Sequence, residues 1–361
     1  GKFALLLVNP KELKQVPGRK TDVKDCQWIQ KLFSVGLLRE SFIPAGKLKE
    51  LRMMVRERED VIEMGGTYVN KMQKALELMN IKLKNVLSQI HGVSGLRMME
   101  AILKGERDPE KLLALCHTSV IKNKSEEVKK ALEGNYNESW LFLLSQNLKM
   151  WKQHQAHLQA IDKKIECLLE ALTIDREVII SSAKEKPIRH HKPEIEGLHQ
   201  KMLRLYGVNV SSLSGLTDYS ALRLAGETGN DLSRFPTVGH FVSWCRLSPR
   251  NSQSGKMNRR LRMRTSSKAG QIFREAAQSL IQSRKTAIGA FMRRIRSKKG
   301  APIAIKAGAR KLAAAYYNIV MQGQEYVEQG IKKYEEKNRA REIRLLSLLA
   351  EKHNMSLTIN A

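Results

Sequence analysis

Two carboxylates stand three residues apart near the start of the chain, within the basic sequence Gly18-Arg-Lys-Thr-Asp22-Val-Lys-Asp25. On a helix, residues at positions i and i+3 lie on one face, with Cβ atoms about 5–6 Å apart. Two carboxylates at that separation can share a hard divalent cation such as the Mg²⁺ of phosphoryl-transfer sites. The same pattern is also typical of a solvated helix start, so Asp22 and Asp25 alone leave both interpretations open.

A second stretch able to do chemistry is Pro249-Arg-Asn-Ser-Gln-Ser254-Gly255-Lys256. A serine before a glycine in a Lys/Arg-rich loop has an exposed hydroxyl and a backbone that can approach a phosphate closely. Such a hydroxyl can attack a phosphodiester while cations neutralise the developing charge. The alternative is a loop serine that hydrogen-bonds to local backbone. The sequence shows no Ser/His/Asp triad, because His240 lies between apolar residues and is more typical of a structural histidine.

The net charge of +28, from 64 Lys+Arg against 36 Asp+Glu, favours a polyanionic partner. A merely soluble basic protein, or one drawn to anionic membrane, is the alternative. The distribution of charge favours nucleic acid, since 16 Lys/Arg and a single acid, Glu275, occur between Arg246 and Lys299. We predict that the nucleic-acid contacts come from Arg250, Lys256, Arg259, Arg260, Arg262, Arg264 and Lys268.

The 361 residues, of which 42% are hydrophobic, allow two or three globular domains. Four scattered cysteines without a Cys-x-x-Cys pair argue against zinc and against a disulfide scaffold. No apolar run approaches the roughly 20 residues of a membrane span, and no signal peptide is visible. We therefore expect a cytoplasmic protein with no membrane partner. Because the chain begins with Gly1 and an apolar run, we also expect that it is cut at its N-terminus.

The first elements predicted are a buried strand at Phe3–Val8 and a helix capped by Thr21 that runs to Phe33 and ends at Gly36. A charged helix follows at Leu48–Met64, and helical periodicity dominates from Tyr68 onward. Further helices are predicted at 219–226 and 301–320 and in the charged tail, 325–353, after a basic linker at 181–193.

The segment from Leu141 to Leu172 carries two heptad rows. A repeat of this length favours a coiled coil, and the polar Gln155 and Asp162 within it are suited to fixing register or partner number. An intramolecular helical hairpin explains the pattern equally well. One row holds Leu144, Trp151, Leu158, Ile165 and Leu172; the other holds Leu141, Leu148, Gln155, Asp162 and Leu169.

Several motifs along the chain resemble the DEDD insertion-sequence transposases, the group related to the pilin-gene-inverting recombinase and described as bridge-RNA-guided recombinases. The N-terminal block comprises Val8-Asn-Pro, the sequence from Val16 to Asp25, Trp28-Ile29, Gly36-Leu-Leu and Ser41-Phe-Ile-Pro44. The C-terminal block comprises the sequence from Glu227 to Pro236, His240–Trp244, Leu247–Pro249, Ser254-Gly255-Lys256, Arg274–Ala277, Ser283–Ala290, Lys299–Pro302 and Ala313–Tyr317.

The resemblance implies a mainly α chain made of four parts. These are the remnant of an α/β RuvC-like (ribonuclease H-like) domain at 1–64, a helical coiled-coil dimerisation region at 65–195, a transposase domain with a serine nucleophile at 196–325, and a charged helical tail at 326–361. It implies a bacterial, nucleoid-associated recombinase that acts on DNA as a homo-oligomer, with a guide RNA as a further partner in this group.

The resemblance also assigns roles at the site. Ser254 matches the serine that attacks DNA to give a phosphoserine intermediate. Asp22 and Asp25 match the last two carboxylates of the family's Mg²⁺ site. The family's first Asp and its Glu precede the Val-Asn-Pro block, so they have no counterpart after Gly1. The expectation is therefore a truncated transposase with an incomplete metal site; the alternative is a non-catalytic, basic, dimeric nucleic-acid-binding protein.

Overall fold

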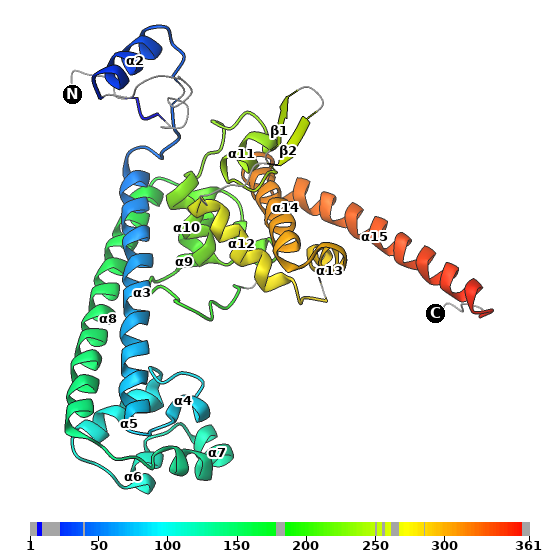
Figure 1. Cartoon of the computed structure of the whole chain (residues 1–361). Helices are drawn as coiled ribbons and strands as arrows, with labels where there is room; N and C mark the ends of the chain where they lie inside the picture. The colour runs from blue at the N-terminus through cyan, green and yellow to red at the C-terminus, as the bar shows by residue number, and fades with distance from the viewer. Residues whose placement is uncertain are drawn as a thin grey trace.

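The computed structural model describes residues 6–8, 22–38, 40–177, 185–249, 251–254, 257–260, 267–284 and 286–355. These residues are mainly helical, as predicted, and their one sheet is a two-stranded antiparallel hairpin. Two long helices form a stalk, a group of short helices lies at one end of it, and a helical domain packs beside the other end (Figure 1). Within the described parts of the chain, no helix is both long and apolar enough to cross a membrane.

The N-terminal region consists of helix α2 (Asp22–Ser34) and a connection to the stalk. Gly36 ends the helix as predicted, with a φ of 68° that favours glycine. Thr21, the predicted cap, lies outside the described residues. The predicted buried strand at Phe3–Val8 is not found for Leu6 and Leu7, which are 37% and 53% exposed. Its described part makes a single bridge, Val8 to Glu40, and has no sheet to pack against.

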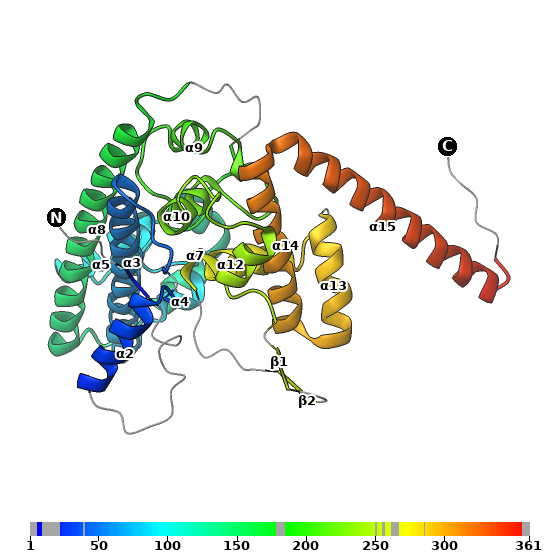
Figure 2. The ribbon, with the colours of Figure 1, turned by 90° about the horizontal axis from the view of Figure 1, so that it is seen from above.

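The stalk is an antiparallel pair of long helices, α3 (Lys47–Leu78) and α8 (Glu138–Thr173), which lie side by side (Figures 1 and 2). Helix α3 extends fourteen residues beyond the predicted end at Met64, because apolar positions such as Met72 and Leu76 continue its buried face. The heptad pattern of α8 therefore describes an intramolecular hairpin. The apolar side chains buried between or beside the two helices include Leu51, Val55, Val61, Met72, Leu76, Leu144, Leu148, Ile161, Ile165 and Leu169.

Four short helices form a small second core at the far end of the stalk (Figure 1). They are α4 (Leu83–Val86), α5 (Val93–Leu103), α6 (Pro109–Ala114) and α7 (Thr118–Ala131). Their buried side chains, among them Met98, Met99 and Ile102, continue the core that begins with Met72 and Leu76 of α3.

The helical domain beside the stalk begins with α9 (Leu198–Tyr206), the 3-10 turn η1 (Val210–Ser212), α10 (Asp218–Thr228) and α11 (Val238–Trp244). The hairpin β1 (Asn251–Ser254) and β2 (Met257–Arg260) follows, and then α12 (Lys268–Leu280), α13 (Ala287–Lys299) and α14 (Ala301–Gln322). Its core is centred on the fully buried Phe241, Phe273 and Tyr316. The last helix, α15 (Gln324–Lys352), projects away from this domain (Figure 2). The predicted C-terminal helices are confirmed.

Candidate functional site

Ser254 is the last residue of strand β1, at the point where the hairpin turns. The register pairs Ser254 with Met257, Ser252 with Arg259 and Asn251 with Arg260, so only residues 255 and 256 connect the strands. The hairpin projects from the helices around it in both views (Figures 1 and 2). The predicted loop is therefore a short β-hairpin. Its polar strands lack the apolar alternation that identifies a strand from sequence.

Helices α11 and α12, which flank the hairpin in the sequence, approach each other closely. A Cβ atom on Gly270 would lie 2.1 Å from the carbonyl oxygen of Cys245, so only glycine fits where the two helices meet. Ser267 caps α12 by accepting a hydrogen bond from the Gly270 amide at 3.0 Å. Gly270 thus lets α12 pack against the end of α11, and these two helices flank the hairpin in the sequence.

The predicted nucleic-acid contacts are only partly visible. Arg250, Lys256, Arg262 and Arg264 lie outside the described residues. Arg259 and Arg260 are on β2, opposite Ser252 and Asn251, so the register places basic positions on the strand beside the serine. Lys268 is the first residue of α12, and its Nζ lies 3.1 Å from Oε2 of Glu59 on the stalk. Its assignment as a nucleic-acid contact stays a prediction.

Asp22 and Asp25 lie in the first turn of α2, where the positive end of the helix dipole favours carboxylates. Asp22 is exposed and Asp25 half-buried. The described residues contain no group of three or more His, Cys, Asp or Glu side chains placed to hold a metal ion. Two carboxylates supply only part of the oxygen ligands that Mg²⁺ takes. The described residues therefore do not form a complete magnesium site.

Helix α2 and the hairpin lie at the same end of the molecule, apart from one another (Figure 1). The segment after α2 nevertheless docks on the helical domain. The ring of Phe42 lies 5.1 Å from that of Phe235 and 5.7 Å from that of Trp244, centroid to centroid. Glu40 forms an ion pair with Arg234 next to these rings. Three of the motifs singled out in the sequence, one from the N-terminal block and two from the C-terminal block, thus share one aromatic cluster.

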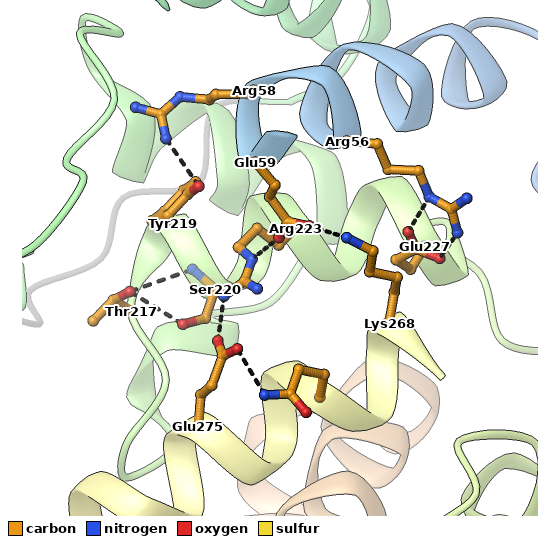
Figure 3. Close-up of polar contacts among 11 residues, drawn as sticks. Arg56, Arg58, Glu59, Thr217, Tyr219, Ser220, Arg223, Glu227, Lys268 and Glu275 are labelled. Atoms are coloured by element: carbon orange, nitrogen blue, oxygen red, sulfur yellow. Dashed lines mark hydrogen bonds and ion pairs between the residues drawn. The ribbon is translucent and has the colours of Figure 1, made fainter. Parts of the chain in front are cut away.

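A network of ion pairs joins the stalk to α10 and α12 (Figure 3). Glu59 of α3 accepts hydrogen bonds from Arg223 and Lys268, and Arg223 also binds Glu275 at 2.6 Å. One helical turn away, Arg56 makes two hydrogen bonds to Glu227, at 2.7 and 2.9 Å. Charge-assisted, two-pronged pairs of this kind fix orientation as well as distance. The single acid of the basic segment, Glu275, is used to position α12.

The pKa values in this network follow from its contacts. The hydrogen bond to Glu227 raises the pKa of the Arg56 guanidinium above its usual value. Burial alone would lower the pKa of Arg223, but its hydrogen bond to Glu275 and the charge of Glu59 outweigh burial and raise it. All these arginines therefore stay charged. No local pattern in the sequence predicts these pairs, because their partners are more than 50 residues apart.

A glycine-containing turn, Ser214–Asp218, leads into α10. In the structure, Thr217 caps α10, and Gly215 has a φ of 81°. Nζ of Lys186, from the linker, lies 2.7 Å from the carbonyl oxygen of Leu213 and 3.4 Å from that of Leu216. Burial lowers the pKa of this ammonium group, while the charge of Asp218 acts in the opposite direction. The turn is thus held from the linker side by a cation.

Two protein-family models match the chain, one in its N-terminal segment and one in the domain that carries the hairpin. Residues 1–81, which include α2 and the docked Phe42, match a DEDD transposase family model. Residues 208–293, which include the hairpin and helices α10, α11 and α12, match the Transposase IS116/IS110/IS902 family. No curated protein matches the chain. Both matches are to transposase families and agree in kind, and together they support an IS110-family DEDD transposase.

Proposed function

We propose that this transposase cuts and rejoins DNA through Ser254. The observation that carries the proposal is the position of Ser254, at the end of β1 on a hairpin that projects from the domain and holds Arg259 and Arg260 on its second strand. A projecting hairpin can reach a phosphodiester in a duplex, which a nucleophile buried among helices cannot. The basic residues beside it suit the phosphate charge.

The chemistry is a pair of transesterifications. The Ser254 hydroxyl attacks phosphorus, so that an Oγ–P bond forms and one P–O bond of the DNA breaks. The hydroxyl proton passes to solvent, and the departing deoxyribose oxygen takes up a proton. In the second step, a deoxyribose hydroxyl of the new strand attacks the phosphoserine, and Ser254 leaves with a proton. One phosphodiester is exchanged for another, so no external energy source is required.

Asp22 and Asp25 are proposed to supply part of a Mg²⁺ site, with other ligands from outside the described residues. When bound, the metal would neutralise charge at the reacting phosphate. The docking of Phe42 on Phe235 and Trp244 supports this role, because it ties the segment after α2 to the domain that carries Ser254. A homo-oligomer and a guide RNA remain predictions of the same hypothesis.

The direct test is Ser254→Ala in a chain supplied with the N-terminal residues that carry the remaining family acids. Incubation with end-labelled element DNA should give a covalent protein–DNA band with the parent chain. We expect none with Ser254→Ala, while DNA binding in a gel shift stays within about twofold. Ser252→Ala, the neighbouring serine on the same strand, is the matched control and should retain the adduct. An adduct that survives Ser254→Ala would refute the assignment.

The second candidate is a basic nucleic-acid-binding protein without catalysis, favoured because the described residues hold no group of three or more side chains placed to bind a metal ion. Both candidates predict steep salt dependence. With about eight phosphate contacts, log K against log salt should have a slope near −7. Binding without any adduct, in a chain that carries all four family acids, would select the non-catalytic candidate.

A further inference from the structure

The hairpin that carries Ser254 is made almost entirely of polar residues. Strand β1 reads Asn-Ser-Gln-Ser and strand β2 reads Met-Asn-Arg-Arg, so Met257 is the single apolar residue of the two strands. A two-stranded hairpin is marginally stable in water unless it packs against other elements through an apolar face. This hairpin instead projects from the helices around it (Figures 1 and 2). Its composition suits a polar ligand better than a hydrophobic core.

The register of the hairpin sorts its residues onto two faces. In an antiparallel pair, residues directly opposite each other share a face, and successive residues along a strand alternate between faces. Asn251 lies opposite Arg260, and Gln253 lies opposite Asn258. Positions 251 and 253 are two apart on β1, so all four residues belong to one face. We call Asn251, Gln253, Asn258 and Arg260 the Asn/Gln face.

The other face carries the serine. Ser254 lies opposite Met257, and Ser252 lies opposite Arg259. The two arginines of β2 are neighbours in the sequence but belong to opposite faces. Arg259 shares its face with Ser254, whereas Arg260 shares its face with three amide residues. The register therefore separates two cations that the sequence alone groups together.

The residue types of the Asn/Gln face match the edges of DNA bases. Asn and Gln can make paired hydrogen bonds to N6 and N7 of adenine, and Arg to O6 and N7 of guanine. A phosphate oxygen only accepts hydrogen bonds, so the carbonyl oxygen of an amide finds no donor there, whereas adenine offers both a donor and an acceptor. The sequence between Asp231 and Glu275 holds no acid that would oppose a nucleic acid.

The dimensions of a two-stranded ribbon favour DNA over RNA. The major groove of B-DNA is about 12 Å wide and admits such a ribbon, whereas that of an RNA helix is too deep and narrow for side chains to read. Residues two apart on a strand are separated by about 6.7 Å, which is about two base-pair steps of 3.4 Å. The pair Asn251–Arg260 and the pair Gln253–Asn258 are thus spaced to meet base pairs two steps apart.

We propose that the hairpin enters the major groove of a DNA duplex and that its Asn/Gln face reads two base pairs beside the phosphate attacked by Ser254. The inference rests on the proposed function and adds its specificity-determining residues. With the Asn/Gln face on the floor of the groove, the other face is turned to the mouth, which is bordered by phosphates. Ser254 and Arg259 are then on the side of the backbone. Arg260 selects guanine, and Gln253 with Asn258 selects adenine.

The test is a selection with the full chain and no added RNA. A pool of 30-base-pair duplexes with ten randomised central base pairs is bound to the protein, and the retained DNA is sequenced. The parent chain should enrich a guanine and an adenine about two base pairs apart. R260Q should lose the guanine preference, with discrimination in direct binding reduced about tenfold or more. Q253A/N258A should lose the adenine preference to a similar extent.

The controls lie on the opposite face of the same hairpin. R259Q removes the same charge from the neighbouring position, so it should weaken binding to all sequences alike, reduce the salt slope by about 0.9 and keep the motif. Ser252→Ala should keep both affinity and motif. Ser254→Ala should keep the motif and lose the adduct, so failure of the proposed nucleophile and failure of base reading give different results.

Several results would overturn the proposal. Equal weakening by R259Q and R260Q with an unchanged motif would show that the hairpin contacts only the backbone. A motif lost in R259Q, alone or together with R260Q, would show that the face does not decide the role. A parent chain that enriches no motif from the duplex pool, but does so from a pool of single-stranded RNA, would assign the Asn/Gln face to RNA.

Discussion

Arg58 and Asp162 form a buried ion pair across the two helices of the stalk, with Nε 2.5 Å from Oδ1 and exposed fractions of 0% and 2%. Arg58 also donates a hydrogen bond to the hydroxyl of Tyr219 at 2.8 Å, and Asp162 accepts one from the amide of Glu194 at 2.9 Å. The pair therefore fixes the register of α3 against α8 at the point where both meet the transposase domain. Asp162, a polar residue of the heptad rows, therefore makes a contact within one chain.

Loss of one partner should destabilise the fold strongly. Asp162→Leu leaves a buried guanidinium without its counter-ion, and about 3–5 kcal/mol of the free energy of unfolding should be lost. Urea denaturation followed by circular dichroism measures this. The double variant R58M/D162L should lose less than the sum of the two single changes. Additive losses would mean that the two side chains do not act as a pair.

The network around Arg223 should matter more than an exposed ion pair. Arg223→Gln removes hydrogen bonds to Glu59 and Glu275 in a largely buried place, and about 1.5–3 kcal/mol of stability should be lost. Lys152→Gln is the matched control, because Lys152 and its partner Glu100 are 52% and 39% exposed. The control should lose less than about 1 kcal/mol. Thermal unfolding of both variants compares them, and equal losses would refute the role of the network.

Gly270→Ala should displace the hairpin. The new Cβ atom would clash with the Cys245 carbonyl oxygen, and overpacking of this kind costs about 1–3 kcal/mol. Because the clash lies between the two helices that flank the hairpin in the sequence, the rate of Ser254 adduct formation should fall more than overall DNA affinity. Gly66→Ala in α3, where nothing lies within 4 Å, should instead stabilise by about 0.5–1 kcal/mol. A Gly270→Ala protein with the parent's melting temperature and adduct rate would contradict the structure.

Stability should fall at alkaline pH because of two buried tyrosines. The hydroxyls of Tyr206 and Tyr316 lie 3.0 Å apart, and Thr228 also contacts Tyr316. Burial raises the pKa of both phenols above 10. In the unfolded chain they lose protons near pH 10, so the stability that they contribute is complete below that pH and is lost as pH rises further. Because two groups titrate, the free energy of unfolding can fall by up to about 2.7 kcal/mol per pH unit in this range.

The check is urea unfolding between pH 9 and 11. Y206F/Y316F should show a shallower decline than the parent, although it is less stable at pH 8 because Thr228 loses a partner. An identical decline in both proteins would mean that these phenols do not govern the alkaline transition.

The helical parts of the fold were predictable because they depend on local periodicity. The 301–320 helix, the charged tail and the helix after Thr21 were found close to their observed bounds, since apolar spacing and glycine stops mark them in the sequence. The hairpin was not predictable, because its polar strands carry no alternation. The heptad pattern of α8 also could not decide between a coiled coil and an intramolecular helical hairpin, since both bury the same row of apolar side chains.

The candidate site divides in the same way. Residue type and motif order identified Ser254, Asp22 and Asp25 as candidates, because nucleophiles and carboxylate pairs are recognisable in the chain itself. Their assignment as catalytic residues stays a prediction. The sequence could not show that Glu59 binds Arg223 and Lys268, or that Phe42 docks beside Trp244. Those contacts join residues that only folding brings together.

By itself, then, the sequence determined the helical class, the basic segment and the family, because propensity, charge and motif order are properties of neighbouring residues. Only the tertiary structure decided that Asp162 pairs with Arg58 within one chain and that Ser254 ends a strand. The physical reason is that each of these depends on packing between helices whose separation along the chain carries no local signal.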